Sequence, residues 1–109
     1  MKKKFNWAKK ARAKGYRVEY DTVIQLRNLG CWAMRLPSRR QVGIMRPIDV
    51  IFWNPITKVF GFVQCKFNKK NFHAEERERF IFVCKKYGAT GYLAHRDNGI
   101  KMETVYDKF

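Results

Sequence analysis

The segment IDVIFWNPITKVFGFVQCK, residues 48–66, predicts a β-hairpin. Its two halves, Ile48–Trp53 and Val59–Lys66, are rich in the β-branched and aromatic residues that favour strands. Asn54-Pro55 and Ile56-Thr57 lie between the halves, and Asn-Pro is a common way to begin a turn. We therefore expect two neighbouring antiparallel strands in this part of the chain.

The position of the predicted turn also decides which residues of the hairpin face each other. If the turn is centred on Ile56–Thr57, Asp49 lies opposite Gln64. Side chains alternate along a strand, so Lys66 points to the same side as Gln64, and Cys65 points to the core. A shift of one residue would separate Asp49 from Gln64.

The rest of the chain predicts further elements around the hairpin. Two segments have apolar residues at helical spacing, and Gly30 and Gly88 stand where these helices would end. Asp97-Asn98-Gly99 is a strong turn signal between two strands. The predicted elements are helices at Tyr16–Leu29 and His73–Tyr87 and strands at Cys31–Leu36, Thr90–His95 and Ile100–Val105. The order αβββαββ predicts an α/β fold, with helices flanking a central mixed β-sheet of about five strands.

Composition indicates one folded and strongly basic domain. The 109 residues are 46% hydrophobic, enough apolar surface for a core, and their number suits a single domain spanning residues 1–109. The formal net charge is +15, so nucleic acid is the first partner to consider. Charge alone would equally suit a ribosomal protein or a protein that binds anionic membranes. No apolar run approaches the roughly 20 residues that cross a bilayer.

Three cysteines, Cys31, Cys65 and Cys84, bear on the redox environment. They are odd in number and lack CxxC spacing, so they predict neither a disulfide framework nor a zinc site. We expect them to be packing residues in a reducing cell interior. His73 and His95 form no compact ligand set with them and are assigned no role.

Two basic segments are candidates for contact with a polyanion. Residues 1–14 are predicted to form a flexible basic arm. Ser38–Pro47 is predicted to form a loop in which Arg39, Arg40 and Arg46 could bind phosphates. The alternatives are a disordered tail and a loop of ordinary surface charge.

The predicted register brings a carboxylate, an amide and an ammonium together at Asp49, Gln64 and Lys66. Two oxygen donors suit a hard divalent cation, and a nearby ammonium can position a water or neutralise charge on a phosphate. Glu19 lies on the first predicted helix and would complete the site if that helix packs over the sheet. A structural ion pair between an Asp and a Lys is the other interpretation of these residues.

These residues resemble a known nuclease signature. Asp49 followed by Gln64-Cys65-Lys66 is similar to the (P)D…(D/E)xK motif of the PD-(D/E)xK nuclease superfamily. Other segments recur in the order seen in archaeal Holliday junction resolvases, and the resemblance spans roughly residues 14–105. The matching segments are Lys14-Gly15, Glu19, Leu29-Gly30, Arg35-Leu36-Pro37-Ser38, Arg46-Pro47-Ile48-Asp49, Phe72-His73-Ala74-Glu75-Glu76, Lys86-Tyr87-Gly88 and Tyr92-Leu93-Ala94.

The resemblance implies a restriction-endonuclease-like core and a homodimeric, Mg²⁺-dependent endonuclease. Such an enzyme recognises four-way DNA junctions by shape and nicks two strands symmetrically. The implied catalytic residues are Glu19, Asp49, Gln64 and Lys66, and the implied metal ligands are Glu19, Asp49, Gln64 and the backbone carbonyl of Cys65. The resemblance also implies no membrane partner, no small-molecule substrate, and a cytoplasmic, nucleoid-associated protein of an archaeal or archaeal-virus host cell.

The residues expected to contact DNA are basic, except for one hydroxyl residue of the predicted loop. They are Lys14, Arg17, Arg35, Ser38, Arg39, Arg40, Arg46, Lys69 and Lys70. No helix-turn-helix or zinc-finger pattern is visible for reading base edges. We therefore expect these residues to follow phosphate backbones, so that junction shape outranks base sequence.

Two positions depart from the superfamily motif. Ile48 stands where a Pro usually precedes the Asp, with Pro47 one place earlier, and Gln64 stands where a Glu is usual. A neutral amide leaves the site with two formal negative charges instead of three. This should weaken Mg²⁺ binding and allow Mn²⁺ to substitute.

Two other functions stay open at this point. One is a non-catalytic nucleic-acid-binding module in which Gln64 marks a lapsed site, and the other is a related nuclease for other DNA structures. The hairpin aromatics Phe52, Trp53, Phe60 and Phe62 also have two interpretations. They form part of a dimer face, or they fill an ordinary core.

Overall fold

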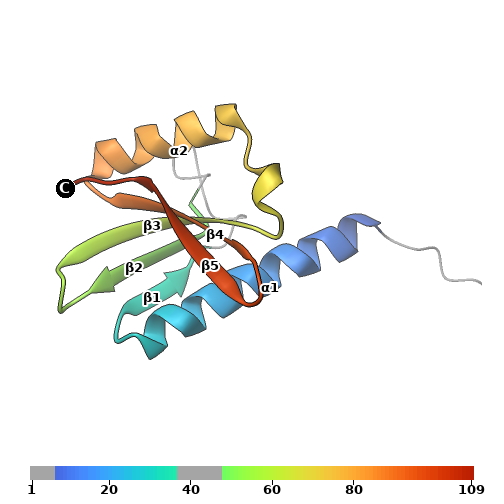
Figure 1. The fold of residues 1–109 in the computed structure, drawn as a ribbon, viewed down its shortest axis with the longest axis horizontal. Coiled ribbons are helices and arrows are strands. Elements are labelled where there is room, and N and C mark those ends of the chain that lie inside the picture. Colours follow the sequence, from blue (N-terminus) through green and yellow to red (C-terminus); the bar gives the residue numbers. More distant parts are fainter. Residues whose placement is uncertain (1–6, 37–47) are drawn as a thin grey trace, which may run out of the picture.

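The computed structural model describes residues 7–36 and 48–109, with side chains from Arg17 onward. Its elements are α1 (Trp7–Asn28), β1 (Trp32–Arg35), β2 (Val50–Asn54), β3 (Val59–Lys66), the short 3-10 helix η3 (Lys69–Asn71), α2 (Ala74–Tyr87), β4 (Thr90–Arg96) and β5 (Ile100–Tyr106). Figure 1 shows the sheet between the two long helices. The predicted α/β fold and the order αβββαββ are confirmed.

The strands form one five-stranded sheet in the order β1-β2-β3-β4-β5. Neighbouring strands are antiparallel except β3 and β4, which are parallel and are connected through α2. A parallel pair needs such a crossover, and its helix packs back onto the sheet. The mixed sheet is therefore the predicted one.

The hairpin of β2 and β3 has the predicted register. Val50 lies opposite Val63, so the next residue outward on each strand places Asp49 beside Gln64. The backbone N–H of Asp49 also donates to the carbonyl of Val63 at 2.9 Å. The register that the sequence predicts for these two residues is confirmed.

Turn and cap residues account for the ends of these elements. The side-chain oxygen of Asn54 accepts hydrogen bonds from the backbone N–H groups of Ile56 and Thr57, which is why Asn favours this turn position. Gly30 and Gly88, which follow α1 and α2, have φ values of +89° and +68°. Residues with a Cβ rarely adopt this conformation, so the two predicted helix stops are confirmed.

Each face of the sheet packs against one helix. The core under α1 contains Val18, Val23, Leu26, Cys31, Ala33, Val50, Phe52, Val63, Cys65 and Ala94. The core under α2 contains Ile48, Phe62, Phe80, Val83, Cys84 and Ala89. Side chains alternate along β3, so Gln64 and Lys66 lie on the α2 side, opposite Cys65. All three cysteines are free and buried, as predicted for packing residues.

Two element boundaries differ from the prediction by more than one residue. α1 begins at Trp7 instead of Tyr16, so residues 7–14 are helical where a flexible arm was predicted. Ala, Lys and Arg fill most of this stretch without Gly or Pro, and all three favour a helix. β2 begins at Val50 instead of Ile48.

Some predicted residues lie outside the described part of the chain. These are residues 1–6 of the arm, residues 37–47 with Ser38, Arg39, Arg40 and Arg46, and the side chain of Lys14. Within the described ranges, neither helix combines the length and apolar character needed to span a bilayer.

Candidate active site

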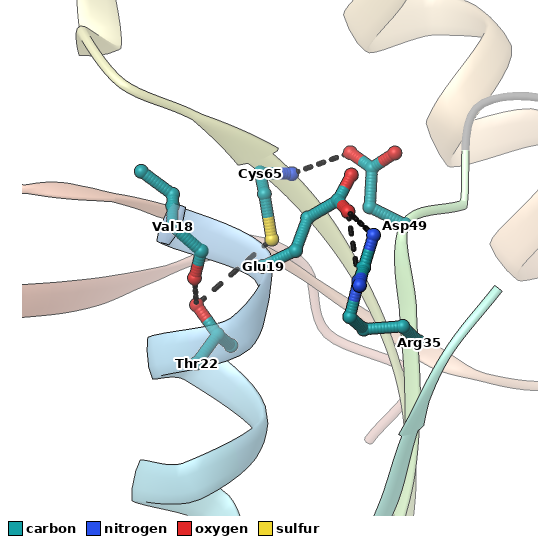
Figure 2. A network of polar contacts seen from close by, with 6 residues as sticks. All are labelled: Val18, Glu19, Thr22, Arg35, Asp49 and Cys65. Carbon is teal, nitrogen blue, oxygen red and sulfur yellow. Dashed lines mark hydrogen bonds and ion pairs between the residues drawn. The ribbon is translucent and has the colours of Figure 1, made fainter. Parts of the chain in front are cut away.

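Two carboxyl groups meet at the end of the sheet where β2 begins and β3 ends. Glu19 is on α1, and Asp49 directly precedes β2. Each carboxyl group influences the pKa of the other, and Figure 2 shows the Glu19 carboxylate between Asp49 and Arg35. Val18 and Val23 of α1 are buried in the core against the sheet, so they hold the helix in place on both sides of Glu19.

The environment of the carboxyl pair disfavours two negative charges. Burial raises the pKa of Asp49 from its ordinary 3.8 to about 7, although the Cys65 N–H donates to its Oδ2 at 2.8 Å and opposes the rise. The charge of Glu19 raises the Asp49 pKa further, and the Lys66 ammonium lowers it. Burial also raises the pKa of Glu19, against the effect of Arg35. Burial of two neighbouring carboxyl groups therefore disfavours a negative charge on both, and a cation bound beside them would favour it.

Arg35, the last residue of β1, contacts the Glu19 member of this pair directly. Its Nη2 and Nε atoms lie 3.0 Å and 3.1 Å from the same oxygen of Glu19, Oε2. The Arg35 side chain is 37% exposed, against 15% for Glu19, so the arginine is the more accessible member. Sequence reasoning predicted a DNA contact here and did not predict this ion pair.

Gln64 and Lys66 lie on β3, on the α2 side of the sheet. Gln64 is 8% exposed, and its buried Oε1 has no hydrogen-bond partner in the described part of the chain. Nζ of Lys66 lies 2.7 Å from Oε2 of Glu76 on α2, and Lys66 also acts electrostatically on Asp49. The prediction of one shared face holds for Gln64 and Lys66. The Asp49 carboxylate instead turns to the Cys65 N–H and to α1.

The oxygen atoms of this cluster suit a hard divalent cation. Among the residues described, no three His, Cys, Asp or Glu side chains gather as a metal site, so acids alone do not supply one. Glu19 and Asp49 offer carboxylate oxygens, and the buried Oε1 of Gln64, on the α2 side of the sheet, is a further oxygen without a hydrogen-bond partner in the described residues. Mg²⁺ is commonly held by one or two carboxylates and keeps several waters, so the two carboxylates fit it. The Cys65 carbonyl stays a predicted ligand.

The remaining described residues predicted to contact DNA lie on two elements. Arg17 is exposed on α1, and Lys69 and Lys70 are exposed on η3, shortly after β3. Nζ of Lys69 lies 3.1 Å from Oε2 of Glu103. Contact of these residues with DNA stays a prediction.

Three polar residues near the site were not assigned a role from the sequence: Glu76, His95 and Glu103. His95 lies opposite Lys66 in the parallel pair of β3 and β4. It is 5% exposed, and its Nε2 is 2.9 Å from Oε2 of Glu103, whose pKa Lys69 and His95 lower. These contacts depend on how β4, β5 and α2 are placed against β3, so the sequence carries no local signal for them.

Large uncharged side chains are exposed on the side of β1 and β2 that faces away from α1. They are Trp32 at 54%, Met34 at 40%, Trp53 at 38% and, at the end of α2, Tyr87 at 45%. Trp32 lies opposite Trp53. Of the hairpin aromatics, Phe52 and Phe62 fill the core, and Trp53 is left exposed.

The mixed sheet, with a helix on each face and a polar cluster where β2 begins and β3 ends, defines a restriction-endonuclease-like α/β fold. Among solved structures, the chain is similar to Hjc, a Holliday junction resolvase from the archaeal hyperthermophile Archaeoglobus fulgidus. The TM-score is 0.66 and the sequence identity 23%, covering 84% of this chain and 73% of that chain. A VRR_NUC domain is also similar, with a TM-score of 0.55 and 21% identity, covering 73% of this chain and 82% of that chain.

Both neighbours share the fold of this chain, so the fold that the sequence resemblance implied is confirmed. No family model and no curated protein matches the sequence.

Proposed function

We propose that this protein is a metal-dependent endonuclease that hydrolyses phosphodiester bonds in DNA, with four-way junctions as its preferred substrate. The observation that carries the proposal is the Glu19–Asp49 carboxyl pair next to Gln64, with Lys66 within electrostatic reach. The fold shared with two structures of a nuclease superfamily supports it, and one of those proteins is a Holliday junction resolvase. The net charge of +15 supports a polyanionic substrate.

Each residue of the cluster has a chemical task in this proposal. Glu19, Asp49 and Gln64 would hold Mg²⁺, or Mn²⁺ in its place, with Asp49 in its deprotonated form. When bound, the cation would supply Lewis acidity for the activation of water and for the charge on the phosphate. The positive charge of the Lys66 ammonium, beside Asp49, would offset the negative charge that builds on the phosphate during the reaction. Glu76 fixes the position of that ammonium.

DNA is bound through its phosphates in this proposal. The exposed cations of Arg17, Lys69 and Lys70 extend from the cluster along α1 and η3. Lys14, Ser38, Arg39, Arg40 and Arg46 remain predicted contacts. Because these residues recognise the backbone and not base edges, the shape of the junction decides binding.

A second copy of the chain is the proposed protein partner, because two symmetric nicks require two active sites. Two chains of net charge +15 repel one another over most of their surfaces. The exposed residues Trp32, Met34, Trp53 and Tyr87 are all uncharged, so this face can be buried between two copies without that repulsion.

The proposal is tested by cleavage of a four-way junction with a mobile core, compared with a linear duplex of the same sequence, in Mg²⁺ and in Mn²⁺. We expect Asp49→Ala and Lys66→Ala to lose at least about a hundredfold in cleavage rate while junction affinity is retained. Lys101→Ala, which changes an exposed lysine of β5, serves as the control and should cut normally. Wild-type cleavage by Asp49→Ala would overturn the proposed site.

A non-catalytic DNA-binding module is the second candidate, favoured by the neutral Gln64 and by the lack of a three-acid cluster in the described ranges. It predicts tight, salt-sensitive binding and no cleavage in either metal. A nuclease for other DNA structures is the third, and a panel of flaps, free ends and junctions separates it from a resolvase.

A further inference from the structure

We propose that Arg35 is an internal counter-cation of the acidic pair, and that it competes with the divalent cation for Glu19. The inference rests on the proposed function, since it concerns the same site. Two nitrogen atoms of Arg35 bind one oxygen of Glu19, at 3.0 Å and 3.1 Å. A metal that takes this oxygen as a ligand has to weaken or displace both contacts.

The charges of the described site make this competition significant. Glu19 and Asp49 are its two acidic groups, and Gln64 adds an oxygen without a charge. Arg35 already neutralises Glu19, and Lys66 acts on Asp49 while it also pairs with Glu76. Gln64 adds no negative charge, so the charge of Glu19 is already offset by Arg35 before any metal arrives.

Arg35 is the partner that can move. Its side chain is 37% exposed, whereas that of Glu19 is 15% exposed and comes from a helix whose neighbouring residues Val18 and Thr22 are fully buried. A long arginine side chain can rotate into solvent at the end of β1 and exchange Glu19 for water or for another anion. Glu19 stays in place and becomes available to the cation.

DNA supplies such an anion. A guanidinium binds phosphate oxygens well, so a phosphate beside the site would draw Arg35 away from Glu19. Metal and DNA would then each strengthen the binding of the other, because coupling between two ligands is reciprocal. The site would load its metal best on DNA and only weakly in the free protein.

The opposite role for Arg35 predicts the opposite result. If Arg35 only orients Glu19 as a ligand, then loss of its charge leaves Glu19 less well placed and weakens metal binding. If it competes, loss of its charge strengthens metal binding. The sign of the change in affinity therefore separates the two roles without any measurement of cleavage.

The experiment is a titration of the full chain with Mn²⁺ alone, followed by electron paramagnetic resonance of the unbound ion, for the wild type, Arg35→Gln, Arg35→Lys and Glu19→Gln. We expect Arg35→Gln to bind Mn²⁺ about tenfold more tightly than the wild type, the scale of one charge-assisted contact. Arg35→Lys keeps the charge and should stay within about threefold of the wild type. Glu19→Gln should bind Mn²⁺ more weakly.

A second titration includes a short DNA duplex. The duplex should raise the Mn²⁺ affinity of the wild type, and raise that of Arg35→Gln much less. Equal or weaker Mn²⁺ binding by Arg35→Gln, with Mn²⁺ still bound by the wild type, would overturn the role of Arg35 and leave the proposed function intact. Absence of Mn²⁺ binding by both proteins, with and without DNA, would overturn both.

Discussion

The ammonium of Lys66 lies 2.7 Å from a carboxylate oxygen of Glu76, so β3 and α2 are joined at the candidate active site. Both side chains are partly exposed, so the pair contributes at most about 1 kcal/mol to folding. Its larger effect is to fix the position of the Lys66 ammonium and to make it less available to another anion.

Glu76→Gln should keep cleavage activity, because the glutamine oxygen can still accept a hydrogen bond from Lys66 while the competing negative charge is lost. We expect the cleavage rate to stay within about threefold of the wild type, and junction affinity to rise slightly. Glu75→Gln changes the adjacent exposed acid of α2 and is the matched control. If Glu76→Gln proves as inactive as Lys66→Ala, Glu76 has a direct part in the reaction.

Asp49→Asn should stabilise the metal-free protein above pH 7. The native state holds the Asp49 proton up to a pKa of about 7, whereas the unfolded chain loses it near 3.8. Between these values the unfolded chain binds fewer protons, so wild-type stability falls as pH rises. Asparagine resembles the protonated acid, and the variant should be more stable at pH 8 by on the order of 2 to 4 kcal/mol.

Urea unfolding at pH 5 and pH 8 without metal measures this difference. The difference in stability between the two proteins at pH 5 should be less than half of that at pH 8. A variant that is less stable than the wild type at pH 8 would show that the Asp49 carboxylate stabilises the fold through its hydrogen bond with Cys65, more than its burial costs.

Gln64→Glu should strengthen Mg²⁺ binding and keep cleavage, because it adds a negative charge at a position that offers only a neutral oxygen. Gln64→Met has a similar volume without the oxygen, so it should fold and bind Mg²⁺ more weakly. Calorimetry with Mg²⁺ and a cleavage assay compare both with the wild type. Complete loss of cleavage in Gln64→Glu would mean that Gln64 serves another purpose than holding a metal.

Trp53→Lys should convert the proposed dimer to monomers, because it places a positive charge on the uncharged face of each of two strongly basic chains. Sedimentation velocity over a range of protein concentrations measures the change. Ile56→Lys introduces the same charge in the turn, where Ile56 is 82% exposed, and should leave the dimer intact. A wild type that is monomeric at every concentration would contradict the proposed partner.

The hairpin and its register were predictable because their signals are local. The turn chemistry of Asn54 and the two-residue alternation along β3 both lie within residues 48–66, and they place Asp49 beside Gln64. The start of α1 was predicted wrongly because lysines suggest a solvated arm, whereas Ala, Lys and Arg together also favour a helix.

The charge pairs of the site could not be predicted in the same way. Arg35 meets Glu19 only because α1 packs along the sheet next to β1, and Lys66 meets Glu76 only because the crossover returns α2 above β3. The burial of His95 opposite Lys66 likewise requires the parallel pairing of β3 and β4. Each contact joins residues far apart in sequence, so it follows from the packed fold and not from a local pattern.

The hydrogen bond from the Cys65 N–H to Asp49 would limit which ions the proposed metal site can select. One oxygen of the carboxylate, Oδ2, already accepts a hydrogen bond from the strand, so the other oxygen is the more available to a cation. Ca²⁺ takes six to eight oxygens and often uses both oxygens of a carboxylate, whereas Mg²⁺ takes one oxygen from each ligand in an octahedron. This backbone contact should therefore make the site bind Ca²⁺ less well than Mg²⁺. A main-chain N–H group of β3 would then contribute to the selection of the ion.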